Sequence, residues 1–334
     1  MSDEILLMIA GRAAEPATLE RREFPDVEFL VVPPGAALDA LAPLVDGIVV
    51  HNATHRLGAP PEAFPRCRVV VRAGVGYDTL DLAGWGARGV PACNVPDYGT
   101  AEVADHAIAL MLALTRGTAA YHDALLHDRT WSHAVAPLVR RLRGAVFGVL
   151  GLGRIGLAAA RRAAGFGMRV VFFDPYLPSG TELAVGYDRA PSLGALMAQS
   201  DVLSVHAPLN DETRGMIGAE ALAQAKPGLI LVNTARGPIV DLDALTDALR
   251  AARIGGAALD VLPVEPADPN HPLIAAWRVG EDWVRGRLTL SPHAAFYSPD
   301  AEQDLRRKAV QTVLAWLRDG RLLNCVNATM LVRD

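Results

Sequence analysis

Short apolar runs alternate with helix-like stretches along most of this 334-residue chain. Five runs in the first third are continuously apolar rather than alternating: residues 5–9, 29–32, 47–50, 69–71 and 92–95. Six more follow at residues 146–150, 169–173, 202–205, 229–232, 256–259 and 288–290. Such runs are typical of parallel strands that are buried on both faces. The pattern therefore predicts an α/β protein with parallel sheets.

The stretches between these runs carry helical periodicity. Residues 101–115 repeat apolar side chains at helical spacing, and Thr100 is a candidate cap at the start of this helix, which makes a natural hinge into a second unit. Helices are also predicted over 155–166, 193–199 and 242–253, and a charged helix over 300–317 that can return to the first domain. Regular strand–helix alternation favours a doubly wound sheet.

Composition and charge exclude several classes of protein. Acidic residues number 37 against 32 basic ones, and no basic block offers a nucleic-acid surface. No apolar stretch approaches the ~20 residues of a membrane span, and residues 1–10 lack the basic start of a signal peptide. The three cysteines form no CxxC pair, and their odd number argues against a disulfide framework. We expect a cytoplasmic protein without a metal site.

The motif Gly151-Leu152-Gly153-Arg154-Ile155-Gly156 follows a predicted strand and opens a predicted helix. Glycines in this context allow a tight turn and a close approach of backbone to a pyrophosphate at the helix N-terminus. Asp174 ends the next strand, 18 residues after Gly156, where a carboxylate binds the ribose hydroxyls and repels a 2′-phosphate. The motif predicts NAD as the cofactor, although a structural glycine turn with a capping aspartate is the plainer alternative.

Polar residues follow nearly every predicted strand of the second part, where open α/β sheets bind their ligands: Gly151, Asp174, His206, Asn233, Arg236, Asp260 and His293. Reduction of a 2-keto acid needs a carboxylate clamp and a proton donor. Arg236 can bind a carboxylate through two parallel hydrogen bonds, and His293 can act as general acid or base. Glu265 can pair with His293 and orient its ring, and Asp260 can bond the nicotinamide carboxamide.

Each of these side chains also has an ordinary structural interpretation. Arg236 is compatible with a surface ion pair, Glu265 with a solvated loop acid and His293 with a satisfied core histidine. The ordered set, rather than any single residue, favours a catalytic site.

These residues and their neighbours resemble the D-isomer-specific 2-hydroxyacid dehydrogenase family over almost the whole chain. The matching stretches are 149–156, 231–241, 257–266, 291–294, 72–78 and 94–105. The stretches 174–177, 293–298 and 323–327 most resemble the C-terminal-binding-protein branch. The resemblance implies hydride transfer between NAD and a small D-2-hydroxy acid or 2-keto acid.

The family resemblance also implies an architecture and a fuller site. A flavodoxin-like substrate domain, from residues 1–101 and 300–334, would surround an inserted Rossmann-type NAD domain at 102–299, and the NAD domains would form a homodimer. Arg236, Glu265 and His293 would be the catalytic trio. Substrate-binding candidates are Arg72, Gly74, Val75, Gly76 and Phe296. Cofactor-binding candidates beyond the glycine motif and Asp174 are His206, Pro208, Thr213, Thr234, Ala235 and Asp260.

Two departures from the family limit this transfer of roles. The 28 residues from Glu265 to His293 include an insert around 277–287, which suggests a lid bearing Trp277 and Trp283 or an anchor to its own domain. Phe296 stands where co-repressor members carry tryptophan, and it fits a pocket wall or a core aromatic. Two other functions stay open: an NAD(H)-sensing co-repressor-like binding protein and a phosphite-type dehydrogenase, whereas the trio weighs against formate.

Overall fold

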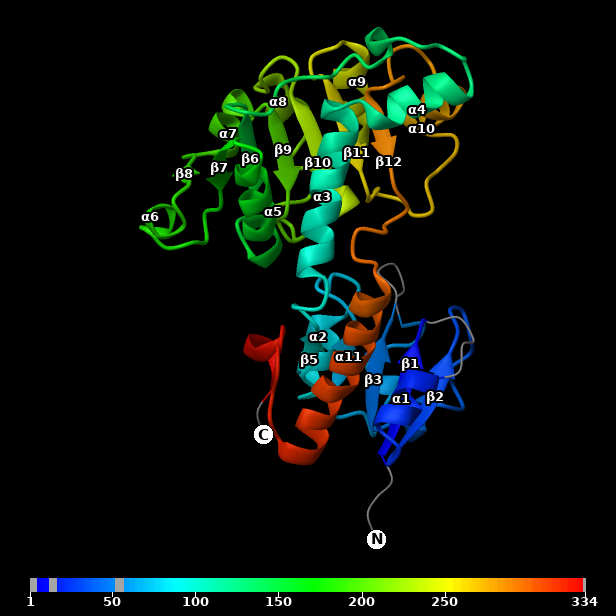
Figure 1. The fold of residues 1–334 in the computed structure, drawn as a ribbon. Helices are drawn as coiled ribbons and strands as arrows, with labels where there is room; N and C mark the ends of the chain where they lie inside the picture. Colours follow the sequence, from blue (N-terminus) through cyan, green and yellow to red (C-terminus); the bar gives the residue numbers. More distant parts are fainter. Residues whose placement is uncertain (1–4, 12–16, 52–56, 333–334) are drawn as a thin grey trace. The chain divides into compact units, whose positions relative to one another are not determined.

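The chain divides into two compact units, each with its own sheet (Figure 1). The computed structural model describes residues 5–11, 17–51 and 57–332. The first unit comprises Met1–Gly99 and Ser298–Asp334, and the second comprises Thr100–Tyr297. The second unit is therefore an insertion, along the chain, into the first.

The first unit is built on a five-stranded parallel sheet. Its strands are β1 (Ile5–Ala10), β2 (Val27–Val32), β3 (Gly47–Val50), β4 (Val70–Arg72) and β5 (Ala92–Asn94), in the order β2-β1-β3-β4-β5. This is the flavodoxin-like order. All five strands were predicted from their apolar runs, and the predicted α/β fold class is confirmed.

Helices cover both faces of this sheet: α1 (Thr18–Glu23), α2 (Leu82–Ala87) and α11 (Pro299–Asp319), with 3₁₀ turns at Ala42–Leu44, Pro61–Ala63 and Ala328–Met330. Val49 and Val71 pack toward α11, whereas their neighbours along each strand pack toward Trp85 of α2. Arg306 of α11 donates two hydrogen bonds, of 2.8 and 2.7 Å, to the buried Glu20 carboxylate of α1. The two ends of the chain thus form one core.

The second unit is built on a seven-stranded parallel sheet. Its strands are β6 (Val146–Leu150), β7 (Arg169–Phe173), β8 (Asp188–Arg189), β9 (Val202–Val205), β10 (Ile230–Asn233), β11 (Gly256–Leu259) and β12 (Leu288–Leu290). Their order is β12-β11-β10-β9-β6-β7-β8, which is the Rossmann order with one added strand. The strand order reverses beside β6, and the glycine motif follows that strand.

Helices lie on both faces of this sheet as well. One face carries α3 (Thr100–Thr115) and α5 (Arg154–Gly165), and the other carries α7 (Leu193–Gln199), α8 (Ala219–Ala223), α9 (Leu242–Arg250) and α10 (Pro272–Val279). The remaining elements are α4 (Thr118–Leu126), α6 (Thr181–Val185) and 3₁₀ turns at His133–Val135 and Gly237–Ile239. Val149 and Phe172 face α3 and α5, whereas Leu150 and Val171 face the other layer. This alternation is the reason that the strands are apolar throughout.

Some local predictions were wrong. Thr100 is the first residue of α3 rather than its cap. The helix predicted over 242–253 ends at Arg250, and Ala252 adopts a left-handed conformation with φ of 51°. Strand β8 was missed because it has only two residues, both charged. No helix within the described ranges has an apolar stretch long enough to cross a bilayer.

Candidate active site

The glycine motif forms a tight turn between β6 and α5. Gly151 has φ of 87°, and a Cβ on Gly156 would lie 2.1 Å from the Gly151 carbonyl oxygen. At Gly153, the first residue before the 12-residue helix α5, a Cβ would meet no atom within 4 Å. The turn is therefore closed on the protein side and open at the helix N-terminus. These features fit the pyrophosphate of a dinucleotide.

Asp174 lies directly after β7 and contacts the same turn. Its Oδ2 accepts a 3.0 Å hydrogen bond from the Leu152 N–H, and its Oδ1 accepts one of 3.1 Å from the Tyr176 N–H. The carboxylate is half-exposed. Asp174 thus holds the glycine turn in place, as the plainer interpretation expected, and keeps lone pairs for a ribose.

His206 follows β9 and contacts Ser204, with 2.8 Å between Nε2 and the serine Oγ. Desolvation of the ring lowers the pKa of His206 to about 4, so that the ring is neutral near pH 7. It cannot serve as a cationic proton donor there. In the loop after His206, the Thr213 hydroxyl donates a 2.6 Å hydrogen bond to the Pro208 carbonyl. This bond fixes the shape of the loop.

The Arg236 loop is shaped by a buried amide at the end of β10. The Asn233 Oδ1 accepts a 3.0 Å bond from the Ala235 N–H, and its Nδ2 donates one of 2.9 Å to the Arg236 carbonyl. Asn233 is fully buried, and it closes the turn that presents Arg236. Arg236 is half-buried, and its Nη1 donates to the Ala235 carbonyl at 2.9 Å. The Thr234 hydroxyl is buried and has no hydrogen-bond partner in the described part of the chain.

Gly237 brings the Arg236 loop against the loop that carries Glu265. A Cβ at Gly237 would lie 1.9 Å from the carbonyl carbon of Leu262. Only a residue without a side chain allows this approach, and the loops after β10 and β11 therefore lie together.

Glu265 and His293 form a direct pair. The His293 Nδ1 lies 2.7 Å from the Glu265 Oε2, and the other glutamate oxygen accepts a 2.9 Å bond from the Leu262 N–H. His293 has φ of 54°, a strained value for a residue with a side chain, and the Phe296 ring meets the imidazole edge-on at 6.4 Å between centroids. The imidazole is therefore oriented from two sides, and its Nε2 points away from the carboxylate.

Asp260 supports the turn that carries His293. Its carboxylate, 2% exposed, accepts hydrogen bonds from the Ser291 hydroxyl at 2.6 Å and from the Ala294 and Ala295 N–H groups at 2.9 Å each. The His106 Nε2 of α3 lies 2.9 Å from the Ser291 hydroxyl. The Asp260 carboxylate thus organises the turn after β12, and its contact with a nicotinamide carboxamide stays a prediction.

The substrate-binding candidates outside this group lie in the first unit, after β4. Arg72 is buried and folds over Gly74, where a Cβ would lie 1.5 Å from the arginine Nη1. Gly74 has φ of 150°, and the Asn94 Nδ2 donates a 2.6 Å bond to the Val75 carbonyl. Val75 and Gly76 are half-exposed, and the hydrogen bond from Asn94 fixes their turn to the end of β5.

The insert between Glu265 and His293 is anchored within the second unit. Helix α10 ends at Val279, so Trp277 and Trp283 do not share a helix face. The Arg250 guanidinium lies 4.8 Å from the Trp283 ring centroid, and Arg287 donates 2.7 Å bonds to the carbonyls of Ile254 and Gly255. These carbonyls precede β11 and lie at the amino ends of the parallel strands. His293 follows β12 and lies at the carboxyl ends. The lid interpretation of Trp283 is therefore wrong.

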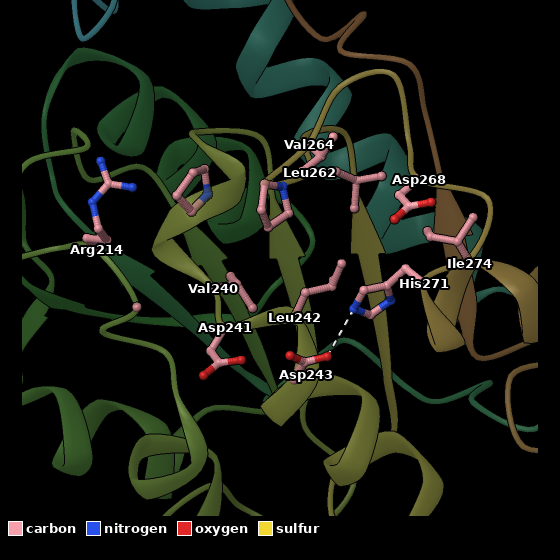
Figure 2. Close-up of a pocket in the computed structure, with 13 residues that line it drawn as sticks. Arg214, Val240, Asp241, Leu242, Asp243, Leu262, Val264, Asp268, His271 and Ile274 are labelled. Carbon is pink, nitrogen blue, oxygen red and sulfur yellow. Dashed lines mark hydrogen bonds and ion pairs between the residues drawn. The ribbon is translucent and has the colours of Figure 1, made fainter.

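A pocket of about 380 Å³ borders the loops after β10 and β11 (Figure 2). Its wall includes Pro238 and residues 262–264, next to Arg236 and Glu265, and a hydrogen bond of 3.2 Å joins His271 to Asp243 at its side. None of the predicted site residues lines this pocket. The candidate site is thus defined by the loop geometry and not by this cavity.

The second unit therefore gathers the candidate trio and the cofactor candidates on the loops that follow its strands. Sequence reasoning missed the structural use of Asn233 and Asp260 and the contribution of His106. The sequence does show a polar residue at the end of a buried strand. This pattern does not distinguish a side chain that contacts a ligand from one that stabilises a loop by hydrogen bonds. Among the described residues, no group of His, Cys, Asp and Glu side chains is arranged to hold a metal ion.

Comparison with known proteins places this geometry in a family. Residues 108–295 match the NAD-binding domain of D-isomer specific 2-hydroxyacid dehydrogenases. The chain is 38% identical over 322 residues to the D-3-phosphoglycerate dehydrogenases of Mycobacterium bovis and Mycobacterium tuberculosis. The match covers 96% of this chain and 58% of those relatives, so the chain spans little more than half of their length.

Solved structures agree with the sequence match. An NADPH-dependent glyoxylate/hydroxypyruvate reductase from Sinorhizobium meliloti, solved with NADP and malonate, is 31% identical, with a TM-score of 0.82 and 99% of both chains covered. A D-lactate dehydrogenase from Aquifex aeolicus, solved with NAD and lactic acid, is 25% identical, with a TM-score of 0.80, and covers 94% of this chain and 96% of its own. This chain belongs to the D-isomer-specific 2-hydroxyacid dehydrogenase family.

Proposed function

We propose that the protein is a cytoplasmic, NAD-dependent dehydrogenase that interconverts a small D-2-hydroxy acid and its 2-keto acid. The observation that carries this proposal is the 2.7 Å contact between the His293 Nδ1 and Glu265, on a turn beside the Arg236 loop. A histidine–carboxylate pair next to an arginine suits a substrate with one carbonyl and one carboxylate.

Each side chain of the trio takes one part of the reaction in this proposal. Arg236 binds the substrate carboxylate. His293 donates a proton to the carbonyl oxygen during reduction and removes it from the hydroxyl during oxidation. Glu265 holds the His293 Nδ1 and orients the ring. NAD(H), when bound on the glycine turn, supplies or accepts the hydride.

A substrate screen tests this proposal directly. Oxidation of NADH is followed at fixed enzyme concentration with glyoxylate, hydroxypyruvate, pyruvate, phenylpyruvate and longer 2-keto acids, and reduction of NAD with phosphite is run in parallel. We expect turnover of at least one 2-keto acid. NADH binding without turnover of any of them, or turnover of phosphite alone, would contradict the proposal.

We expect the protein to prefer NAD over NADP because the Asp174 carboxylate repels a 2′-phosphate. Asp174→Asn removes the charge and keeps one oxygen, which can accept either the Leu152 or the Tyr176 N–H bond, whereas the carboxylate accepts them on separate oxygens. The ratio of kcat/KM for NADPH to that for NADH should rise about tenfold or more in this variant, as an apposed charge worth about 1.4 kcal/mol implies. Equal use of both cofactors by the unmodified protein would refute this role of Asp174.

We also propose a homodimer formed through the second unit, supported by exposed apolar residues on α4 and the segment after it. Leu126 is 61% exposed and Trp131 is 90% exposed, and large aromatic side chains are enriched at interfaces. The double variant Leu126→Glu/Trp131→Glu should shift the mass measured by light scattering from dimer to monomer. Leu183→Glu, which changes a leucine on α6 that is 84% exposed, is the control. A dimer that survives the double variant would exclude this surface.

A further inference from the structure

Two of the three cysteines face each other in the first unit. Residues 324–326, after α11, run antiparallel to β5 and form an isolated bridge in which Cys93 is opposite Cys325. The Asn94 N–H donates to the Asn324 carbonyl at 3.2 Å, and the Val326 N–H donates to the Ala92 carbonyl at 2.8 Å. These two bonds flank the cysteine pair and fix its register.

This register brings the two thiols together. Because the hydrogen bonds lie on either side of the pair, Cys93 and Cys325 occupy a non-hydrogen-bonded position, where opposite Cα atoms are about 4.5 Å apart. That spacing lies within the roughly 4.4–6.8 Å that disulfides span. Both side chains belong to the same apolar cluster, in which Cys325 packs against the core that holds Cys93, and the Cys325 Sγ donates a 3.3 Å hydrogen bond to the Asn327 Oδ1. A bond between the two sulfurs therefore needs little movement of the backbone.

We propose that Cys93 and Cys325 form an oxidisable dithiol that small disulfides such as glutathione disulfide close to an intramolecular disulfide. The half-exposed Cys325 loses its proton to solvent, attacks one glutathione sulfur and expels the other as thiolate. Cys93 then loses its proton and attacks the Cys325 sulfur, which expels the second glutathione. Two protein thiols and one glutathione disulfide thus become one protein disulfide and two glutathione thiols.

The surroundings assign the order of these two steps. Burial, together with the neighbouring Cys325, raises the pKa of the Cys93 thiol to about 12, so Cys93 is a poor first nucleophile. Cys67 is buried elsewhere in the same unit, its Sγ donates to the Val69 carbonyl at 3.3 Å, and burial raises its pKa to about 12. Cys67 therefore stays reduced and serves as an internal reference.

Closure would lock the segment after α11 onto β5. This segment is already held by Asn327, which is fully buried, accepts a 2.8 Å bond from the Ala92 N–H and donates one of 3.1 Å to the Val90 carbonyl. A covalent link between positions so distant in the chain restricts the unfolded state most. The oxidised protein should therefore be more stable than the reduced protein.

The experiment counts thiols in the full chain. The reduced protein is incubated with glutathione disulfide, freed of reagent, denatured and titrated with a chromogenic disulfide, and its peptides are mapped by mass. We expect the count to fall from three to one, the mapped link to join Cys93 to Cys325, and dithiothreitol to restore three. The melting temperature should rise by roughly 5 °C on oxidation.

Two variants define the site. In the Cys67→Ala variant, the thiol count should fall from two to none on treatment with glutathione disulfide. In the Cys325→Ser variant, no disulfide to Cys93 should form. Retention of all three thiols in the unmodified protein would overturn the proposal. So would a glutathione adduct that stays on Cys325 without closure, or a disulfide between two copies of the chain, seen as a doubled mass under denaturing, non-reducing conditions.

Discussion

Replacing His293 with alanine should lower kcat for the best 2-keto acid by about 10²–10⁴-fold, which is the usual contribution of a positioned acid–base group. The Nδ1 of this ring is held by Glu265, so the proton to be transferred is on the opposite nitrogen. His206 cannot take over, because its pKa of about 4 leaves it neutral. Steady-state kinetics with saturating NADH measures the loss.

Two further variants separate chemistry from folding. His293 has a positive φ, which asparagine tolerates well, so His293→Asn should keep the turn and lose the same activity. His271→Asn changes a histidine that caps α10, outside the proposed machinery, and should retain kcat. Glu265→Gln should lose less activity than either His293 variant, because the ring stays in place. Near-normal turnover in both His293 variants would remove this residue from the mechanism.

Replacing Asp260 with alanine should lower the free energy of unfolding of the second unit by about 3–5 kcal/mol. The substitution leaves the Ser291 hydroxyl and two N–H groups without their buried acceptor, and each such group costs about 1–3 kcal/mol. Activity should fall as well, because the turn before Ala294 carries His293. Urea unfolding followed by circular dichroism measures the first effect.

This variant also distinguishes a loop brace from a cofactor contact. If Asp260 acted only on the nicotinamide, Asp260→Ala would raise the Kd for NADH and leave the urea midpoint unchanged, which is the result that contradicts our interpretation. Asp243→Ala is the matched control. That aspartate is exposed, contacts His271 at 3.2 Å and should change the unfolding free energy by less than about 0.5 kcal/mol.

The sheets were predictable because their strands are buried on both faces. Val149 and Leu150 point to the helix layers on opposite faces of the sheet. Both layers bury apolar side chains, so the strand appears in the sequence as a continuous apolar run. The glycine turn was predictable for a related reason, since Gly151 and Gly156 stand where backbone atoms leave no room for a side chain. Such constraints restrict the type of residue at each position, and they are therefore visible in the sequence.

The functions of individual polar residues were less predictable, because they depend on contacts between distant segments. The sequence predicts Asp260 as a cofactor contact but does not show its bracing role, because its partners lie 31 to 35 residues further on. The sequence left two roles open for the insert, a lid near His293 and an anchor to its own domain, and the contacts of Trp283 and Arg287 favour the anchor. The three-residue strand β12 lies between the insert and His293. It takes the chain from the amino ends of the parallel strands to their carboxyl ends.

The buried contact between Arg306 and Glu20 has a consequence for the order of assembly during synthesis on a ribosome. The second unit is one continuous stretch and can fold as soon as it has emerged. The first unit cannot, because Val49 and Val71 need the apolar face of α11 to cover them. Until α11 is synthesised, one face of the five-stranded sheet stays exposed. We expect a chaperone that binds exposed apolar surface to bind this face during synthesis.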